Sequence, residues 1–152
     1  MFVTKIGKPS IFAIAAPPAM SSAGSIVISS PTMFDKVIPI FRMFDVAKAK
    51  EFYLDYLGFR IDFEHRFEGV SPLYMGISRD GFSLHLSEHY GDGSPGSVVA
   101  VWTKDVHAFH AELTAKQYGY LRPGVQRQPW GDEMTVIDPF SNRIRFLQRV
   151  EA

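Results

Sequence analysis

The chain has 152 residues, which is enough for one domain or for two small halves that share a core. Basic and acidic side chains number 16 each, so the net charge of zero gives no reason to expect nucleic acid or an anionic membrane surface as a partner. The lack of cysteine excludes disulfides, thiolate metal sites and a cysteine nucleophile, and it agrees with a reducing, cytoplasmic location.

Residues 1–34 differ in composition from the rest of the chain. Their only charged side chains are Lys5 and Lys8, and a proline pair interrupts the moderately apolar stretch of residues 10–20. That stretch is too short to span a bilayer. We expect a disordered N-terminal extension ahead of a folded part that spans residues 35–152, with a secretory signal peptide as the alternative.

The folded part contains an internal repeat. Each copy begins with an apolar extended run that reaches an aspartate, over residues 38–46 in the first copy and 98–106 in the second. A helical pattern follows each aspartate and ends before a glycine. These two predicted helices are Val46–Leu57 before Gly58 and Val106–Tyr118 before Gly119. Aspartate as N-cap and glycine just past the last turn are typical helix boundaries.

Each copy also ends in a predicted β-hairpin. The turn of the first hairpin is Arg79-Asp80-Gly81, and the turn of the second covers residues 138–142. A glycine-rich linker, residues 91–96, separates the copies. Each copy therefore consists of a strand, a helix and about three strands.

Alternation along the strands predicts two different sheet faces. The first face is uniformly apolar and should pack under the helices; it comprises Phe41, Met43, Phe82, Leu84, Leu86, Val99, Val101, Ile144 and Phe146. The second face mixes charged, hydroxyl and aromatic side chains among apolar ones; it comprises Ile38, Ile40, Arg42, Ser83, His85, Ser87, Val98, Ala100, Trp102, Arg143, Arg145 and Leu147. A mixed face of this kind indicates the wall of a ligand-filled concavity.

Four short segments carry a family resemblance: residues 51–53 (Glu-Phe-Tyr), 57–59 (Leu-Gly-Phe), 128–133 (Gln-Pro-Trp-Gly-Asp-Glu) and 138–142 (Asp-Pro-Phe-Ser-Asn). Their order on the repeated frame resembles the glyoxalase / bleomycin-resistance / dioxygenase (vicinal-oxygen-chelate) superfamily, and residues 128–133 resemble its bleomycin-resistance branch. The resemblance implies an α+β fold of two βαβββ units, residues 36–90 and 97–150. Their curved mixed sheets should carry the helices outside and enclose a concave cleft. Ser141 stands where that turn usually has glycine, so we expect mild strain there.

Enzymes of this superfamily bind a divalent metal on the concave sheet. By the repeat, the positions that the resemblance assigns to the metal are Ile38, His85, Val98 and Arg145. Only His85 can act as a ligand, because Ile and Val have no lone pair and the guanidinium of arginine stays protonated. We therefore predict no metal and no cofactor.

Six residues are candidates for ligand binding: Arg42, His85, Trp102, Trp130, Glu133 and Arg145. Trp102 resembles a bleomycin-resistance tryptophan that stacks on the ligand, although a core role is the alternative. His85 and Trp130 either line the cleft or pack structurally. The arginines either pair with Glu133 or Asp62 or present donors to a ligand.

We predict a homodimer that sequesters a small amphipathic or aromatic molecule, such as a bleomycin-like drug, without catalysis and with antibiotic resistance as the outcome. The basic cleft fits a cationic drug poorly, so the resemblance favours this style of site rather than bleomycin itself. One alternative is a metal-dependent glyoxalase, lyase or dioxygenase with an atypical ligand set, or a metal-free enzyme that uses His85 as a base. The other alternative is a partner-regulated structural module whose cleft is closed by side chains.

Overall fold

The computed structural model describes residues 32–69 and 72–150, and the expectation for most of the N-terminal extension falls outside these ranges. In chain order the elements are β1 (Ile40–Arg42), α1 (Val46–Lys50), η1 (Glu51–Tyr56), β2 (Arg60–Arg66), η2 (Phe67–Gly69), β3 (Leu73–Arg79), β4 (Phe82–Ser87), β5 (Val98–Trp102), α2 (Val106–Ala115), β6 (Val125–Gln128), β7 (Gly131–Ile137) and β8 (Arg143–Gln148). Within the described residues, no helix is long and apolar enough to cross a membrane.

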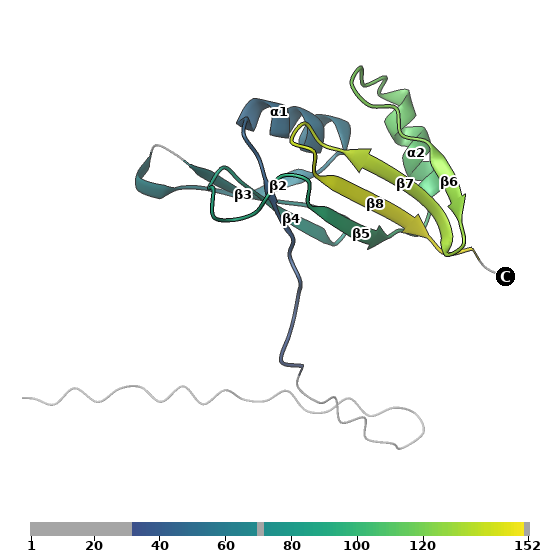
Figure 1. Ribbon diagram of the computed structural model, residues 1–152, viewed down its shortest axis with the longest axis horizontal. Coiled ribbons are helices and arrows are strands. Elements are labelled where there is room, and N and C mark those ends of the chain that lie inside the picture. Colours follow the sequence, from purple (N-terminus) through teal and green to yellow (C-terminus); the bar gives the residue numbers. More distant parts are fainter. Residues whose placement is uncertain (1–31, 70–71, 151–152) are drawn as a thin grey trace, which may run out of the picture. The chain divides into compact units, whose positions relative to one another are not determined.

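The strands form two four-stranded sheets with the same topology, ordered β1-β4-β3-β2 and β5-β8-β7-β6. In each sheet the strand that comes first in the chain (β1 or β5) pairs in parallel with the strand that comes last (β4 or β8), and the remaining pairs are antiparallel. Figure 1 shows the two sheets, the first in blue to teal and the second in green to yellow, each with its own helix. This repeated strand–helix–three-strand pattern confirms the predicted α+β fold of βαβββ units.

Both helices begin as predicted. The Asp45 side chain accepts a hydrogen bond from the Lys48 amide at 2.9 Å, and the Asp105 side chain accepts one from the Ala108 amide at 2.8 Å. An aspartate N-cap of this kind satisfies one of the amides that the first helical turn leaves without a partner. The first helix continues from α1 into the π-helical η1, where the Leu57 amide donates to the carbonyl of Phe52, five residues earlier.

The predicted end of the second helix was wrong. We expected it to continue to Tyr118 before Gly119, whereas α2 ends at Ala115 and Gln117 takes a left-handed conformation, with φ 51°. This early end lets the Tyr118 ring stack on Tyr56 of the first unit, with ring centroids 4.4 Å apart. Tertiary packing has therefore overridden the local glycine signal.

The two predicted sheet faces are confirmed for the residues that lie in strands, whereas Ile38, which we placed on the second face, precedes β1. The buried core contains Phe41, Met43, Leu84, Leu86, Ile144 and Phe146, and the predicted inward residues Phe82, Val99 and Val101 pack against it. Helix residues complete the same core: Ala49, Phe52, Tyr53, Tyr56, Val106 and Leu113. Because one core includes the helix-covered side of both sheets, the opposite sides of the sheets point away from it.

Buried polar contacts join the two units. The Tyr53 hydroxyl donates a 2.7 Å hydrogen bond to Asp138 in the β7–β8 turn, and both residues are buried. Burial raises the pKa of Asp138 above its usual value, although hydrogen bonds from Asn142 and Tyr53 oppose this shift. Burial raises the pKa of Tyr53 as well, so its hydroxyl remains a donor at neutral pH.

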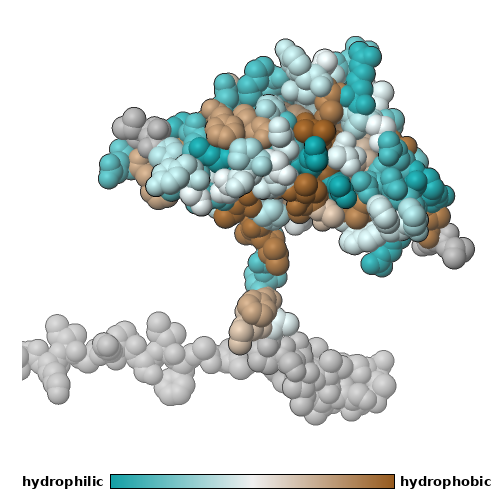
Figure 2. Space-filling model, in the orientation of Figure 1, coloured by the Kyte–Doolittle hydropathy of each residue, from teal (hydrophilic) through white to brown (hydrophobic). Residues whose placement is uncertain are grey.

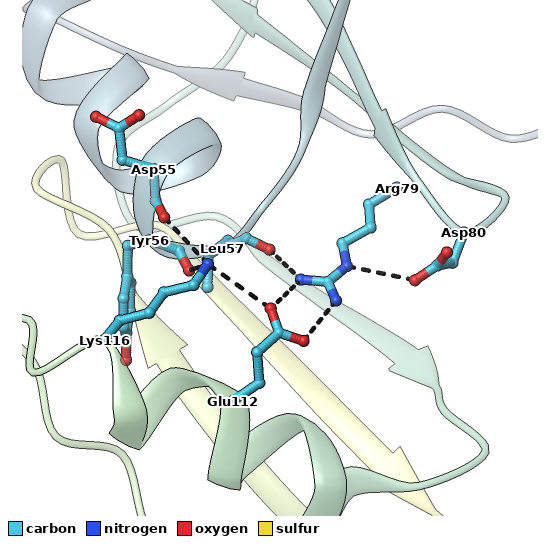
Figure 3. A network of polar contacts seen from close by, with 7 residues as sticks. All are labelled: Asp55, Tyr56, Leu57, Arg79, Asp80, Glu112 and Lys116. Carbon is cyan, nitrogen blue, oxygen red and sulfur yellow. Dashed lines mark hydrogen bonds and ion pairs between the residues drawn. The ribbon is translucent and has the colours of Figure 1, made fainter.

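A second set of polar contacts joins the β3–β4 hairpin to α2 (Figure 3). Arg79 donates to both carboxylate oxygens of Glu112, at 2.9 and 2.7 Å, and to the carbonyl of Leu57 at 2.6 Å. Lys116 donates to the carbonyls of Asp55 and Tyr56 at 3.1 and 2.7 Å. The two cations thus satisfy three carbonyls at the end of the first helix, which have no partner inside the helix.

Candidate functional site

The side of sheet β5-β8-β7-β6 that points away from the core is called here the C-terminal open face. It comprises Val98, Ala100, Trp102, Glu133, Thr135, Ile137, Arg143, Arg145 and Leu147. Trp102 is 52% exposed, Val98 49% and Ile137 42%. Large apolar side chains exposed together among charged ones are typical of a binding surface.

A chain of polar contacts crosses this face. The Trp130 indole N–H donates to Glu133 Oε2 at 3.1 Å, and Glu133 Oε1 lies 3.8 Å from Arg145 Nε. The Thr135 hydroxyl donates to the same oxygen of Glu133 at 3.2 Å. Three predicted site residues, Trp130, Glu133 and Arg145, therefore lie together. At 3.8 Å the ion pair is long, so the guanidinium keeps donors for another partner.

Trp102, the fourth predicted residue on this face, ends β5 and lies opposite Leu147. The guanidinium of Arg149 lies 4.8 Å from the centre of the Trp102 ring, which is a cation–π contact. The ring remains half exposed despite this contact. These observations place Trp102 at the surface of the chain and argue against the alternative of a core aromatic.

The corresponding side of sheet β1-β4-β3-β2 is called the N-terminal open face. It comprises Ile40, Arg42, Phe63, Tyr74, Gly76, Ser78, Ser83, His85 and Ser87. His85 lies opposite Ile40 on one side and opposite Gly76 on the other. Its side chain is half-buried.

Two aromatic residues hold the His85 ring. Tyr74 Oη lies 2.8 Å from His85 Nδ1, and the Phe63 ring meets the imidazole edge-on at 5.2 Å between centroids. Gly76 makes this arrangement possible, because a Cβ there would collide with the Phe63 ring. Burial, and secondarily the charge of Asp92, raises the pKa of the Tyr74 phenol. The phenol is therefore protonated at neutral pH and can donate a hydrogen bond to the imidazole of His85.

Arg42 occupies the same open face at the end of β1. Its guanidinium donates to the Ser87 carbonyl at 3.4 Å and lies 4.9 Å from the centre of the Phe44 ring. Arg42 and Asp62 lie on the opposite edge strands of this sheet, β1 and β2, which argues against the expected alternative of a pair between them. Asp62 accepts from Ser78 at 2.9 Å and from Arg60 at 3.3 Å. The six predicted residues thus fall into two groups, with Arg42 and His85 on one sheet and the others on the second.

Phe63 and Tyr74 are site residues that the sequence analysis missed. The alternation of Tyr74, Gly76 and Ser78 with Met75 and Ile77 was a usable signal for β3. Phe63 gave no such signal, because a register shift in β2 between Ile61 and Phe63 interrupts the alternation.

A cavity of about 580 Å³ opens beside Trp102, between the β3–β4 turn and the start of α2. Aromatic side chains contribute to its lining together with polar and charged ones; the aromatic residues are Phe59, Phe82, Trp102, Phe109 and Phe146. The Arg79–Glu112 pair also borders it, and the Arg79 guanidinium lies 4.9 Å from the centre of the Phe109 ring. Figure 2 shows hydrophobic patches that interrupt an otherwise polar surface near the middle of the folded part.

Residues 23–152 match the family model described as glyoxalase superfamily protein. The chain belongs to the glyoxalase superfamily. No curated protein matches the chain closely enough to add to this assignment.

Solved structures of superfamily members agree with the fold. A glyoxalase/bleomycin resistance protein from Streptomyces sp. CB03234 is 27% identical, with a TM-score of 0.57 over 73% of this chain and 97% of that one. The bleomycin-binding protein of bleomycin-producing Streptomyces verticillus, complexed with copper(II)-bleomycin, is 27% identical, with a TM-score of 0.60 over 79% of this chain and 100% of that one. A bleomycin resistance determinant encoded on the transposon Tn5 is 22% identical, with a TM-score of 0.59 over 78% of this chain and 100% of that one, and it supports the fold alone.

The superfamily's divalent metal does not fit the side chains of this member. The metal positions that the resemblance implies hold Ile38, His85, Val98 and Arg145. Ile40 and Gly76 lie opposite His85, and Ala100 and Thr135 lie opposite Arg145; of these four neighbours only Thr135 has a side-chain oxygen, and its hydroxyl donates to Glu133. Throughout residues 32–69 and 72–150, no three His, Asp or Glu side chains cluster so as to hold a metal ion.

Proposed function

We propose that the protein binds a small aromatic or amphipathic molecule between its open faces and releases it chemically unchanged. The observation that carries the proposal is the half-exposed Trp102 ring on a sheet face that also presents Glu133 and Arg145. A flat aromatic anchor beside a few polar groups is the usual composition of a small-molecule site. The likeness to a protein solved with copper(II)-bleomycin, at 27% identity, supports this style of binding.

We further propose that the cleft forms between two copies of the chain. Both open faces point away from the shared core, so one chain does not bring its own two faces together. In a twofold dimer, the N-terminal open face of each copy would cover the C-terminal open face of the other, giving two equal clefts. Such pairing would bury Ile40, Phe63, Val98 and Ile137, which are all exposed in the single chain.

Light scattering on the protein as it elutes from a size-exclusion column tests whether it is a dimer. We expect twice the mass of the 17.1 kDa chain, and we expect Ile40→Asp to shift the protein toward the monomer. Val150→Asp, which places the same charge at an exposed valine outside both open faces, is the matched control. A monomeric wild-type protein at concentrations where ligand binds would contradict the dimer.

Calorimetric titration with 2-naphthylmethanol, a neutral aromatic alcohol, tests binding. We expect saturable binding with one site per chain, and mass spectrometry should recover the alcohol unchanged. His85→Ala separates binding from catalysis. On the binding proposal, the variant should weaken the affinity at most moderately, and neither it nor the wild type should convert the alcohol. A product that forms with wild-type protein but not with His85→Ala would favour the alternative of an enzyme with His85 as base.

A further inference from the structure

Two arginines lie side by side on β8, and the residues directly opposite them in the adjacent strands carry no negative charge. Arg143 and Arg145 are two residues apart on one strand, so both side chains belong to the C-terminal open face. Arg145 lies between Ala100 and Thr135 in the adjacent strands. Arg143 lies between two apolar residues, Val98 and Ile137. The strands that flank the pair therefore offer no carboxylate directly opposite either arginine.

Among the residues that the structure describes, Glu133 is the one carboxylate in an ion pair with either arginine, and other groups already bind it. Glu133 lies 3.8 Å from Arg145 and accepts hydrogen bonds from Trp130 and Thr135. Arg143 forms no ion pair with any side chain in residues 32–69 or 72–150. Two neighbouring guanidinium groups, of which only Arg145 has a carboxylate partner and that at 3.8 Å, repel each other, so this arrangement destabilises the protein when no ligand is bound.

Arg79 shows how this chain treats an arginine with a structural role. Its guanidinium forms two hydrogen bonds with Glu112, one with the Leu57 carbonyl and one with Asp80. Its side chain is 25% exposed, whereas the Arg145 side chain is 47% exposed. The contrast indicates that the donors of the arginine pair on β8 serve a partner outside the chain.

We infer that the ligand is an aromatic anion whose ring stacks on Trp102 and whose carboxylate binds Arg143 and Arg145. This inference rests on the proposed function, and it adds the charge of the ligand. Trp102 lies opposite Leu147, one pair along from Arg145, so the ring and the nearer guanidinium are diagonal neighbours on one face. Strands lie about 4.8 Å apart and rise about 3.3 Å per residue, so these diagonal neighbours are roughly 8 Å apart, a distance that one aromatic carboxylate spans. Guanidinium groups suit a carboxylate because they offer two parallel N–H donors.

Three probes that share one ring system test the inferred charge of the ligand: 2-naphthoate, 2-naphthylmethanol and 2-naphthylmethylammonium. Each is titrated by calorimetry into the full-length protein at low and at high salt. We expect naphthoate to bind about tenfold more tightly than the alcohol and the ammonium compound to bind most weakly. The preference for naphthoate should shrink at high salt, since partly exposed charges are screened.

Variants then assign the preference to the arginine pair. Arg143→Gln and Arg145→Gln should each weaken naphthoate binding roughly five- to tenfold, and each should weaken binding of the alcohol much less, so that the ratio of the two affinities falls. Arg122→Gln, which removes an exposed arginine outside the open faces, should change neither affinity. Without ligand, neither variant on β8 should melt below the wild type, because each substitution removes a repulsion.

The possible failures are distinguishable. If none of the three probes binds, the proposed function is wrong and the inference falls with it. If the alcohol binds but the ammonium compound binds as tightly as naphthoate, the proposed function stands and the inference about charge is overturned. A lower melting temperature of Arg143→Gln with an unchanged affinity for naphthoate would also overturn it, since the arginine would then be structural.

Discussion

Arg79 and Glu112, which are 33 residues apart in sequence, form a two-pronged ion pair across the boundary between the βαβββ units, with N–O distances of 2.9 and 2.7 Å. The Arg79 guanidinium also satisfies the Leu57 carbonyl at the end of the first helix. One side chain therefore contacts both the helix of its own unit and the helix of the other unit. We expect this pair to stabilise the arrangement of the two units.

Replacing Glu112 by Gln should lower the free energy of unfolding by about 1 kcal/mol, because the pair is only partly screened by solvent. Urea denaturation measures this change. The control is Glu64→Gln. Glu64 forms an ion pair with Lys50 at 2.6 Å, and this pair is more exposed to solvent than Arg79–Glu112, with 38% of the Lys50 side chain and 41% of the Glu64 side chain accessible. The control should cost less than about 0.5 kcal/mol. Equal effects of the two substitutions would show that the Arg79–Glu112 pair has no special role.

The effect of Glu112→Gln should depend on pH. Hydrogen bonding from Arg79, followed by the charges of Arg79 and Lys116, holds the pKa of Glu112 below its usual value, although burial acts in the opposite direction. A carboxyl group with a lowered pKa stabilises the fold above its unfolded pKa, and this stabilisation is lost as the pH falls through the folded pKa. The difference between wild type and variant should therefore shrink below pH of about 4. A difference that stays constant from pH 7 to pH 3 would contradict this.

Tyr53→Phe should destabilise the protein by about 1–2 kcal/mol, because it removes one donor from the buried carboxyl group of Asp138. The hydroxyl lost is the one that donates at 2.7 Å across the unit boundary. Thermal and chemical denaturation both report this change. Tyr90→Phe removes the hydroxyl of a tyrosine that is 86% exposed and should leave stability unaltered. Tyr53→Phe with wild-type stability would mean that the hydrogen bond contributes nothing net.

Ser141→Gly should stabilise the protein by up to about 1 kcal/mol, since glycine adopts a positive φ without strain. Ser141 has φ 71° in the β7–β8 turn, as its place in a turn that usually has glycine led us to expect. Ser141→Ala, which keeps the Cβ, should bring no gain. A loss of stability in the glycine variant would show that added freedom of the unfolded chain outweighs the strain.

Local signals in the sequence were enough to predict where the helices begin, where the first hairpin turns and which way the strand residues face. Asp45 and Asp105 cap their helices, and the Asp80-Gly81 pair forms the predicted turn with φ values of 48° and 85°. Alternation of side chains along a strand assigned the faces of β1, β4, β5 and β8, and β4 has the clearest alternation of apolar and polar residues. These features depend on residues close to one another in the chain, which is why they are visible without a structure.

Features that depend on contacts between distant residues were not predictable. The early end of α2 depends on Tyr118 stacking on Tyr56, and the placement of Phe63 depends on an irregularity in β2. Likewise, the sequence identified His85 but could not show that Tyr74 holds its imidazole. For the candidate site, residue types and strand faces were therefore predictable, whereas the partners of each side chain were not.

Calorimetric titration of 2-naphthylmethanol into wild type and Trp102→Ala, with the free energy of unfolding measured for both, tests the central claim most directly. If Trp102 is the aromatic anchor, the variant should bind about 1–3 kcal/mol more weakly. Its stability should stay close to that of the wild type, because the half-exposed ring contributes little to the core. Unchanged affinity together with severe destabilisation would place Trp102 in a packing role and leave the proposed site without its anchor.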